Sequence, residues 1–114
     1  MHKLRWSVYL LRCRGGALYT GIASDVARRL KEHRQGRGAK FLRGKGPLRL
    51  VFKQVVGAKG LALRVEYRIK QLPKARKEAL LKRKGLLSRV VAQVKARTGS
   101  PRQGLPVARG SDGT

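Results

Sequence analysis

Acidic side chains are scarce in this 114-residue chain, which has five Asp and Glu against 29 Lys and Arg. Two histidines and one cysteine add to this short supply of metal ligands and acid–base groups, and three tyrosines are the further candidates for acid–base chemistry. A thiolate zinc site needs more Cys and His than this, and a two-metal site needs a cluster of carboxylates. The composition therefore excludes both kinds of site.

Disulfides and long apolar runs are also missing. The only cysteine, Cys13, excludes a disulfide framework and fits a reducing cytoplasm. The short apolar stretch near the N-terminus ends at Arg12 and Arg14 and has no small-residue cleavage site, so we expect no signal peptide. We predict a cytoplasmic protein without a membrane partner, which is a monomer or a weak dimer.

The chain does have a large positive charge and enough apolar residues to fold. The formal net charge is +24, and 41% of the residues are hydrophobic. This length supports one domain with a small core, and the hydrophobic content argues against a wholly disordered basic chain. The charge predicts a polyanionic partner, above all nucleic acid.

The first half of the chain predicts a β-hairpin followed by a helix. Residues 7–13 and 17–22 have the composition of strands, and residues 14–16 have that of a turn. A three-residue loop pairs Cys13 with Ala17 and puts Tyr9 and Tyr19 on one face as diagonal neighbours. A two-residue loop would put the tyrosines on opposite faces, so we predict the three-residue loop. Ser24-Asp25 predicts the cap of a helix that runs to about residue 34.

The second half predicts one more strand and further helices. The expected elements are a loop at 36–47, a strand at 48–56, and helices ending near 72, at 74–84 and at 86–94. We therefore expect an α/β (α+β) fold, a small three-stranded, mainly antiparallel sheet flanked by helices. The predicted organisation is a main domain at 1–84, an amphipathic extension at 85–97 and a disordered basic tail at 98–114.

Tyr9 and Tyr19 lie on the hairpin, Arg29 and His33 on the first helix, and Glu66 on a later helix. In this order they form a pattern that resembles the GIY-YIG nuclease superfamily. The segments Gly38-Ala39-Lys40-Phe41 and Pro47-Leu48 are similar to its small stand-alone bacterial branch. Ser7-Val8-Tyr9 stands where that family has Gly-Ile-Tyr, and Tyr19-Thr20-Gly21 where it has Tyr-Ile-Gly. The segment 25–33 resembles the family's first helix with its Arg and His, and the segment 63–70 resembles the helix that carries its metal-binding Glu. The resemblance covers roughly residues 5 to 82 and implies the GIY-YIG nuclease fold.

The resemblance implies a phosphodiester hydrolase that uses one divalent metal, Mg²⁺ or Mn²⁺, held by Glu66. Tyr9 would take the proton from the attacking water, and the metal and surrounding Lys and Arg would favour its phenolate. Arg29 would neutralise charge on the scissile phosphate. Tyr19 would bond to the nucleophile or phosphate, His33 would orient water or phosphate, and Gly21 would allow close backbone approach.

Basic residues around these motifs are predicted to contact nucleic-acid phosphates. They are Arg28, Arg34, Arg37, Lys40, Arg43, Lys45 and Lys70. Some family members have a late Asn, and this chain has no Asn at all. That role is either absent in this branch or filled by another group, such as Lys70.

The expected function is a metal-dependent DNA endonuclease, with branched or single-stranded repair or recombination intermediates as candidate substrates. Two alternatives stay open at this point. One is a non-catalytic, basic nucleic-acid-binding protein on the same scaffold. The other is a nuclease that acts on RNA, although aromatic residues are few and no stacking signature of an RNA-binding module is present.

Overall fold

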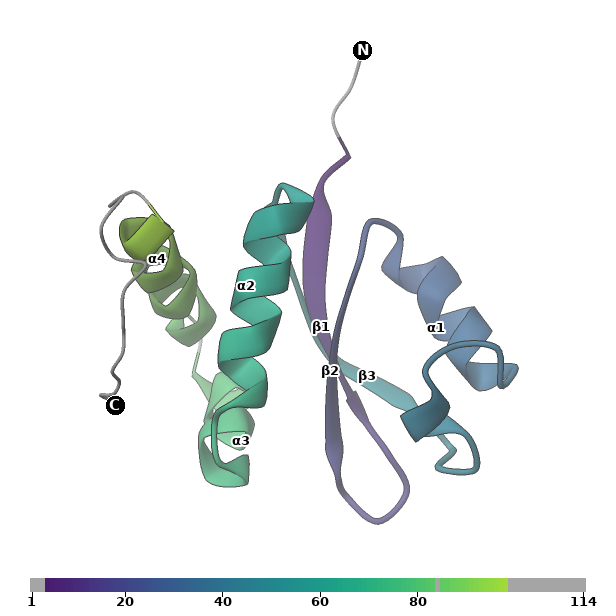
Figure 1. The fold of residues 1–114 in the computed structure, drawn as a ribbon. Coiled ribbons are helices and arrows are strands. Elements are labelled where there is room, and N and C mark those ends of the chain that lie inside the picture. Colours follow the sequence, from purple (N-terminus) through teal and green to yellow (C-terminus); the bar gives the residue numbers. More distant parts are fainter. Residues whose placement is uncertain (1–3, 84, 99–114) are drawn as a thin grey trace.

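A three-stranded antiparallel sheet forms the centre of the molecule, as predicted. The computed structural model describes residues 4–83 and 85–98 (Figure 1). The sheet order is β2–β1–β3, with β1 at Trp6–Arg12, β2 at Leu18–Ala23 and β3 at Arg49–Gly57. The predicted third strand begins and ends one residue later than expected. Most of the predicted disordered tail, from residue 99 onward, lies outside the described residues.

The β1–β2 hairpin has the register that the three-residue loop predicts. The Cys13 N–H donates to the Ala17 carbonyl at 2.9 Å, which closes the loop. Tyr9 then lies opposite Gly21, and Leu11 lies opposite Tyr19. Gly15 and Gly16 have φ of 89° and 96°, a backbone region that favours glycine. The loop glycines therefore fix the register, and the register places both tyrosines on one face.

Four α-helices flank the sheet. They are α1 (Val26–Arg34), α2 (Lys59–Lys70), α3 (Lys74–Lys82) and α4 (Leu86–Thr98). The Arg28 N–H donates to the Asp25 carboxylate at 3.1 Å, so Asp25 is the expected cap of α1. The expected loop at 36–47 contains a short 3₁₀ helix, η1 (Lys40–Leu42), which the sequence did not predict because a single turn has no periodicity. No helix in the described part of the chain is long and apolar enough to cross a membrane.

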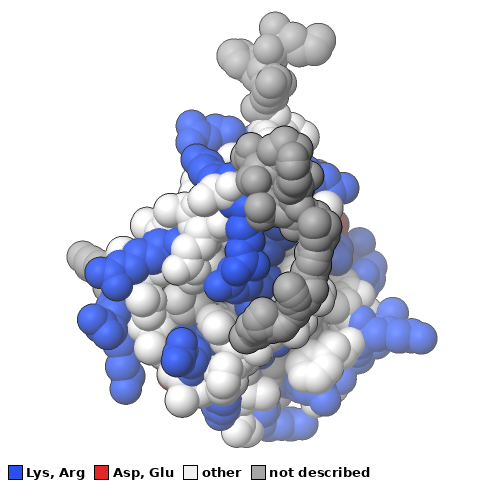
Figure 2. Space-filling view, turned by 60° about the vertical axis from the view of Figure 1, so that its left-hand side comes forward, with Lys and Arg blue, Asp and Glu red and all other residues white. Residues whose placement is uncertain are grey.

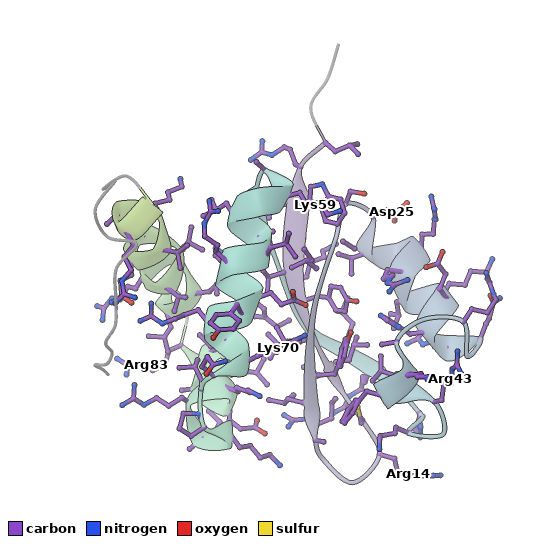
Figure 3. The ribbon with its side chains drawn as sticks, in the orientation of Figure 1. Arg14, Asp25, Arg43, Lys59, Lys70 and Arg83 are labelled. Carbon is purple, nitrogen blue, oxygen red and sulfur yellow. The ribbon has the colours of Figure 1, made fainter. Side chains whose placement is uncertain are left out.

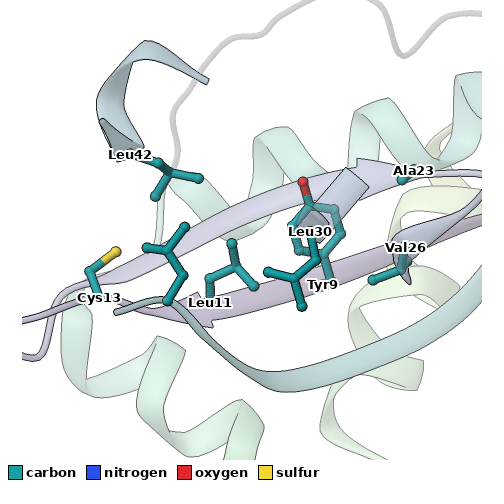
Figure 4. Close-up of a cluster of buried hydrophobic side chains, with 8 residues drawn as sticks. Tyr9, Leu11, Cys13, Ala23, Val26, Leu30 and Leu42 are labelled. Atoms are coloured by element: carbon teal, nitrogen blue, oxygen red, sulfur yellow. The ribbon is translucent and has the colours of Figure 1, made fainter. Parts of the chain in front are cut away.

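The sheet has a hydrophobic cluster on each face because side chains along β1 alternate between the two. On one face, Tyr9 and Leu11 pack with Val26 and Leu30 of α1 (Figure 4). On the other face, Val8 packs with side chains of α2, α3 and α4; these are Val65, Ile69, Leu80, Leu87 and Val94. Figure 1 shows α1 on one side of the sheet and α2, α3 and α4 on the other. The first of these faces carries the candidate site.

Basic side chains are not confined to one patch of the surface. Figure 2 shows Lys and Arg spread across the face that it presents, with hardly any acidic side chain among them. One of the few acids, Glu78 of α3, makes a two-pronged, partly exposed ion pair with Arg12 of β1, through N–O distances of 2.5 and 2.9 Å. Charge alone therefore does not locate a functional site, whereas the arrangement of individual polar groups does.

Candidate active site

Strands β1 and β2 and helix α1 bring Tyr9, Tyr19 and His33 together. The Tyr9 hydroxyl oxygen lies 2.7 Å from His33 Nε2. The Tyr19 ring centroid is 6.5 Å from that of Tyr9 and 5.6 Å from that of His33, with an edge-on approach to the imidazole. Tyr9 and His33 are almost fully buried, with exposed fractions of 1% and 3%. The site therefore has a buried polar pair behind a half-buried Tyr19.

Two glycines make room for this pair. A Cβ at Gly21 would lie 2.5 Å from the Tyr9 hydroxyl oxygen, and a Cβ at Gly38 would lie 2.0 Å from His33 Nδ1. Both distances are far inside van der Waals contact, so neither position accommodates a side chain without displacing the ring. Gly21 was among the predicted site residues. Gly38 was not, because its requirement comes from a tertiary contact and not from its own backbone conformation.

Hydrogen bonds define which nitrogen of His33 carries the proton. The Ala39 N–H donates to His33 Nδ1 at 3.2 Å, which uses the lone pair of that nitrogen. Burial lowers the pKa of His33, with the charge of Arg29 contributing, so the ring is neutral near pH 7. The proton of the neutral ring then lies on Nε2, which donates to the Tyr9 oxygen. We assign this tautomer from the hydrogen bonds, and it leaves the Tyr9 oxygen as an acceptor.

Burial and the surrounding charges oppose each other at Tyr9. Burial, with a contribution from Tyr19, raises the pKa of Tyr9 to about 12. The charge of Arg29 and its hydrogen bond to the phenol lower that pKa, and Glu66 raises it. Burial also raises the pKa of Tyr19, and Lys70 opposes this. In the protein without metal or substrate, therefore, burial outweighs the basic surroundings. The expectation that a metal together with Lys and Arg favours the phenolate stays a prediction.

Helix α2 contributes Glu66 and Lys70 at the edge of the tyrosine pair. Glu66 Oε2 lies 3.3 Å from Lys70 Nζ, and its side chain is only 17% exposed. The Lys70 ammonium lies 5.9 Å from the Tyr19 ring centroid, on the side of α2 that faces β2 (Figure 3). The charge of Glu66 raises the pKa of both Tyr9 and Tyr19, so this half-buried acid acts electrostatically on both phenols.

The Glu66 carboxylate fits a hard divalent cation whose other ligands are water and phosphate oxygens. The described residues contain no group of three or more His, Cys, Asp and Glu that could hold a metal by themselves. A single carboxylate with water and phosphate oxygens is a normal environment for Mg²⁺. An ion there would compete with the Lys70 ammonium for the carboxylate, and Lys70 would then be available for a phosphate.

Arg29 is held in place by an acidic neighbour on the same helix. Its Nη1 donates to Glu32 Oε1 at 3.0 Å, and Arg28 Nε lies 3.6 Å from the other carboxylate oxygen. Glu32 was not a predicted site residue. The i, i+3 spacing of Arg29 and Glu32 is the signal that could have identified the pair.

The basic residues predicted to contact phosphate have varied surroundings. Lys70 lies in the site, and Arg28 lies one residue from Arg29. Arg34 donates to the Leu48 carbonyl at 3.0 Å, and Arg37 donates to Gln35. Lys40, Arg43 and Lys45 lie in or beside η1 (Figure 3). Their contacts with nucleic acid stay predictions.

Phe41 of η1 belongs to a segment that resembles the small bacterial branch, but the sequence did not predict it as a site residue. Its ring stacks on Tyr19 with a centroid distance of 6.0 Å and an interplanar angle of 19°. Lys45 Nζ lies 4.6 Å from the Phe41 ring centroid, and Phe41 remains 51% exposed. Phe41 therefore extends the aromatic surface of the site towards solvent.

The chain is similar to several bacterial proteins. It is 58% identical over 77 residues to a UPF0213 protein of Aeromonas salmonicida, covering 68% of this chain and 57% of that protein. It is 59% identical over 76 residues to the UPF0213 protein YhbQ of Salmonella typhimurium, covering 67% and 76%. A solution structure of a UPF0213 protein from Bacillus halodurans is 42% identical, covers 78% of this chain and 95% of that one, and has a TM-score of 0.47. The chain spans little more than half of the Aeromonas relative.

Residues 5–79 match the GIY-YIG catalytic domain family, and this segment contains all five predicted catalytic residues. The match covers the sheet, α1 and α2, which are the elements that build the site. GIY-YIG domains are the catalytic domains of a nuclease family, and the chain belongs to this family, among the proteins named UPF0213.

Proposed function

We propose that this protein is a metal-dependent endonuclease that hydrolyses phosphodiester bonds in DNA. The observation that supports this most directly is the Tyr9 oxygen, which accepts a hydrogen bond from His33 Nε2 and lies in reach of Arg29. A buried phenol with two such donors has the arrangement that stabilises a phenolate when further positive charge arrives. Glu66, which could hold that charge, lies nearby on α2.

Tyr9 acts as the general base. Its oxygen takes the proton of the attacking water as the water oxygen bonds to phosphorus and the bond to the leaving oxygen breaks. A phenol with a pKa of about 12 is a poor base by itself. Positive charge from a metal held by Glu66 would favour its deprotonated form, so the rate would depend on assembly of the full site.

The other side chains orient the phosphate and the base. Arg29, held by Glu32, presents its remaining N–H groups to the phosphate and offsets the charge that grows there. Tyr19 bonds to the nucleophile or to a phosphate oxygen. Both ring nitrogens of His33 are engaged, one by Tyr9 and the other by Ala39. We therefore propose that His33 orients Tyr9, and not a water molecule or a phosphate.

Glu66 would hold Mg²⁺ or Mn²⁺, with water and phosphate oxygens as further ligands. When bound, such an ion supplies positive charge that stabilises the leaving oxygen. The products would carry 5′-phosphate and 3′-hydroxyl ends, as the resemblance implies. Backbone and shape recognition suit branched or single-stranded intermediates of repair or recombination.

The test is cleavage of supercoiled plasmid, branched DNA and RNA oligonucleotides in Mg²⁺, Mn²⁺ or EDTA. We expect metal-dependent cleavage of DNA that is lost in Glu66→Gln and kept in Glu78→Gln, which changes an ion-paired glutamate away from the site. Tyr9→Phe should lower the rate by about 10²–10⁴-fold, as for loss of a general base. Tyr67→Phe, the same change at a 67% exposed tyrosine, should not.

Each alternative corresponds to a different outcome. Binding without cleavage in every metal would favour the non-catalytic binding protein, and faster cleavage of RNA would favour the RNA nuclease. Cleavage that survives in Glu66→Gln would contradict the assignment of the metal to Glu66.

A further inference from the structure

A cavity of about 400 Å³ adjoins the candidate site at one end of the sheet. It lies between the N-terminal parts of α1 and α2, where Lys59 and Asp25 are labelled in Figure 3. Trp6, Ile22 and Leu63 give it apolar walls, and Arg28, Arg29 and Lys59 give it positive charge. Its volume falls in the range of small-molecule pockets, about 300–1,000 Å³.

The cavity shares one residue with the candidate active site. Arg29, the predicted phosphate-binding residue, belongs to both. Leu63, on the opposite wall, precedes Glu66 by one helical turn on α2. Along the hairpin, the lining residue Ala23 pairs with Ser7, two residues before Tyr9 on the same face of β1. A chemical group bound in this cavity would therefore lie next to a phosphate held by Arg29.

The lining has the chemistry of a site for a planar, weakly polar group next to an anion. Leu63 is 46% exposed and lines the cavity, so it gives the wall an accessible apolar surface. The Lys59 ammonium lies 5.0 Å from the Trp6 ring centroid, at the mouth of the cavity. The two lining acids are already engaged, Asp25 by the α1 backbone and Glu32 by Arg28 and Arg29. The arginines and Lys59 can therefore face a phosphate while the walls face an apolar ring.

We propose that this cavity binds an unstacked nucleobase of the nucleic-acid strand, the one that flanks the phosphate held by Arg29. The inference rests on the proposed function for the identity of the ligand. The base packs between Trp6 and Leu63, and Arg28 and Lys59 contact its phosphates. Stacking and apolar contacts of this kind tolerate every base, so the site selects an accessible base and not a sequence.

Trp6 is the only tryptophan of the chain, so its fluorescence reports on this cavity directly. The experiment titrates the full chain, in EDTA to prevent cleavage, with a short single-stranded oligonucleotide and with an abasic oligomer of equal length and charge. We expect Trp6 quenching by the first oligomer and about tenfold weaker binding of the second, since one stacked base contributes about 1–3 kcal/mol. Leu63→Ala should weaken binding of the base-bearing oligomer alone.

Val55→Ala is the matched control, because Val55 is 49% exposed on β3 and does not line the cavity. Equal affinity and equal quenching for the two oligomers would show that only phosphates bind, and would overturn the inference. The same holds if Leu63→Ala behaves like Val55→Ala. Base-dependent quenching by a protein that cleaves nothing would support the cavity and contradict the nuclease. Cleavage without base-dependent binding would support the nuclease and contradict the cavity.

Discussion

At the residue scale, the contact between Tyr9 and His33 in the candidate site depends on the absence of two β-carbons. Tyr9 and His33 can approach each other only because Gly21 and Gly38 leave the space that side chains would fill. The Ala39 N–H then holds the His33 ring with Nε2 towards Tyr9. A residue that never touches substrate can in this way determine the orientation of the base.

Gly38→Ala should disable the site without unfolding the domain. The new Cβ would lie 2.0 Å from His33 Nδ1, so the ring must move and lose its bonds to Ala39 and Tyr9. We expect a fall in cleavage rate of about 10²-fold, within the range for impaired acid–base catalysis. The measurements are the rate and the nitrogen chemical shifts of the His33 ring.

Gly60→Ala is the control, because the nearest atom that its new Cβ would meet is Nη1 of Arg64, at 3.9 Å. Alanine is the better helix former, so this change should be neutral or slightly stabilising. Retention of the wild-type ring shifts in Gly38→Ala would contradict the proposed role of the glycine.

His33 should make the stability of the fold sensitive to mild acid. Burial lowers its pKa in the folded chain, so the unfolded chain binds the proton first as the pH falls. The stabilisation is complete above the unfolded pKa, about 6.5, and is lost as the pH falls through the lower folded pKa. Urea-denaturation midpoints of the wild type should therefore decrease below about pH 6.5.

His33→Gln keeps an amide N–H for Tyr9 but cannot titrate, so its midpoint should stay level across this range. The pKa values of Glu32 and Glu78 are lowered by their arginine partners, and their contributions are lost only in more acidic solution. Parallel pH profiles for the wild type and His33→Gln would show that another group titrates.

At the scale of elements, the sequence predicted what depends on local chemistry. The turn residues Gly15 and Gly16 determine the hairpin register, and the register alone puts Tyr9 and Tyr19 together. The contact between Gly38 and His33, and the position of α2 beside β2, depend on tertiary packing and have no local signal. For the same reason Phe41, which stacks on Tyr19 from a single 3₁₀ turn, was missed.

Helix α4 should be part of the cooperative fold and not an optional addition. Leu87 is 1% exposed and Val94 6% exposed, in the cluster that contains Val65 and Ile69 of α2. Since α2 carries Glu66, packing by α4 supports the helix that borders the site. We expect Leu87→Ala to lower the free energy of unfolding by about 2–5 kcal/mol, the usual cost of truncating a buried leucine.

Chemical denaturation measures this change, and a single transition should be retained. Leu4→Ala serves as the control, because Leu4 is 67% exposed and its truncation should change stability by no more than about 0.5 kcal/mol. A loss of only that size for Leu87→Ala would mean that α4 contributes little to the domain.

At the scale of the whole molecule, a charge of +24 makes strong but unselective attraction to nucleic acid unavoidable. Because exposed Lys and Arg lie on α1, β3, α2, α3 and α4, and are spread across the face in Figure 2, binding strength alone cannot show that the proposed site is occupied. The dependence of binding on salt is more informative, because it reports how many phosphates of the bound strand the protein neutralises. Each phosphate contact adds about 0.9 to the slope of log affinity against log salt for duplex DNA.

Arg43 and Arg76 are both exposed arginines, so their removal changes the net charge equally. Arg43 follows η1 beside the site, whereas Arg76 lies on α3, on the other side of the sheet from α1 (Figure 1). With EDTA present, Arg43→Ala should reduce the salt slope by about 0.9 and Arg76→Ala should leave it unchanged. Equal reductions would mean that DNA binds across the whole basic surface, and no reduction in either would place its path away from η1. A selective reduction would instead show that a uniformly basic molecule directs the strand to the face with Tyr9 and Tyr19.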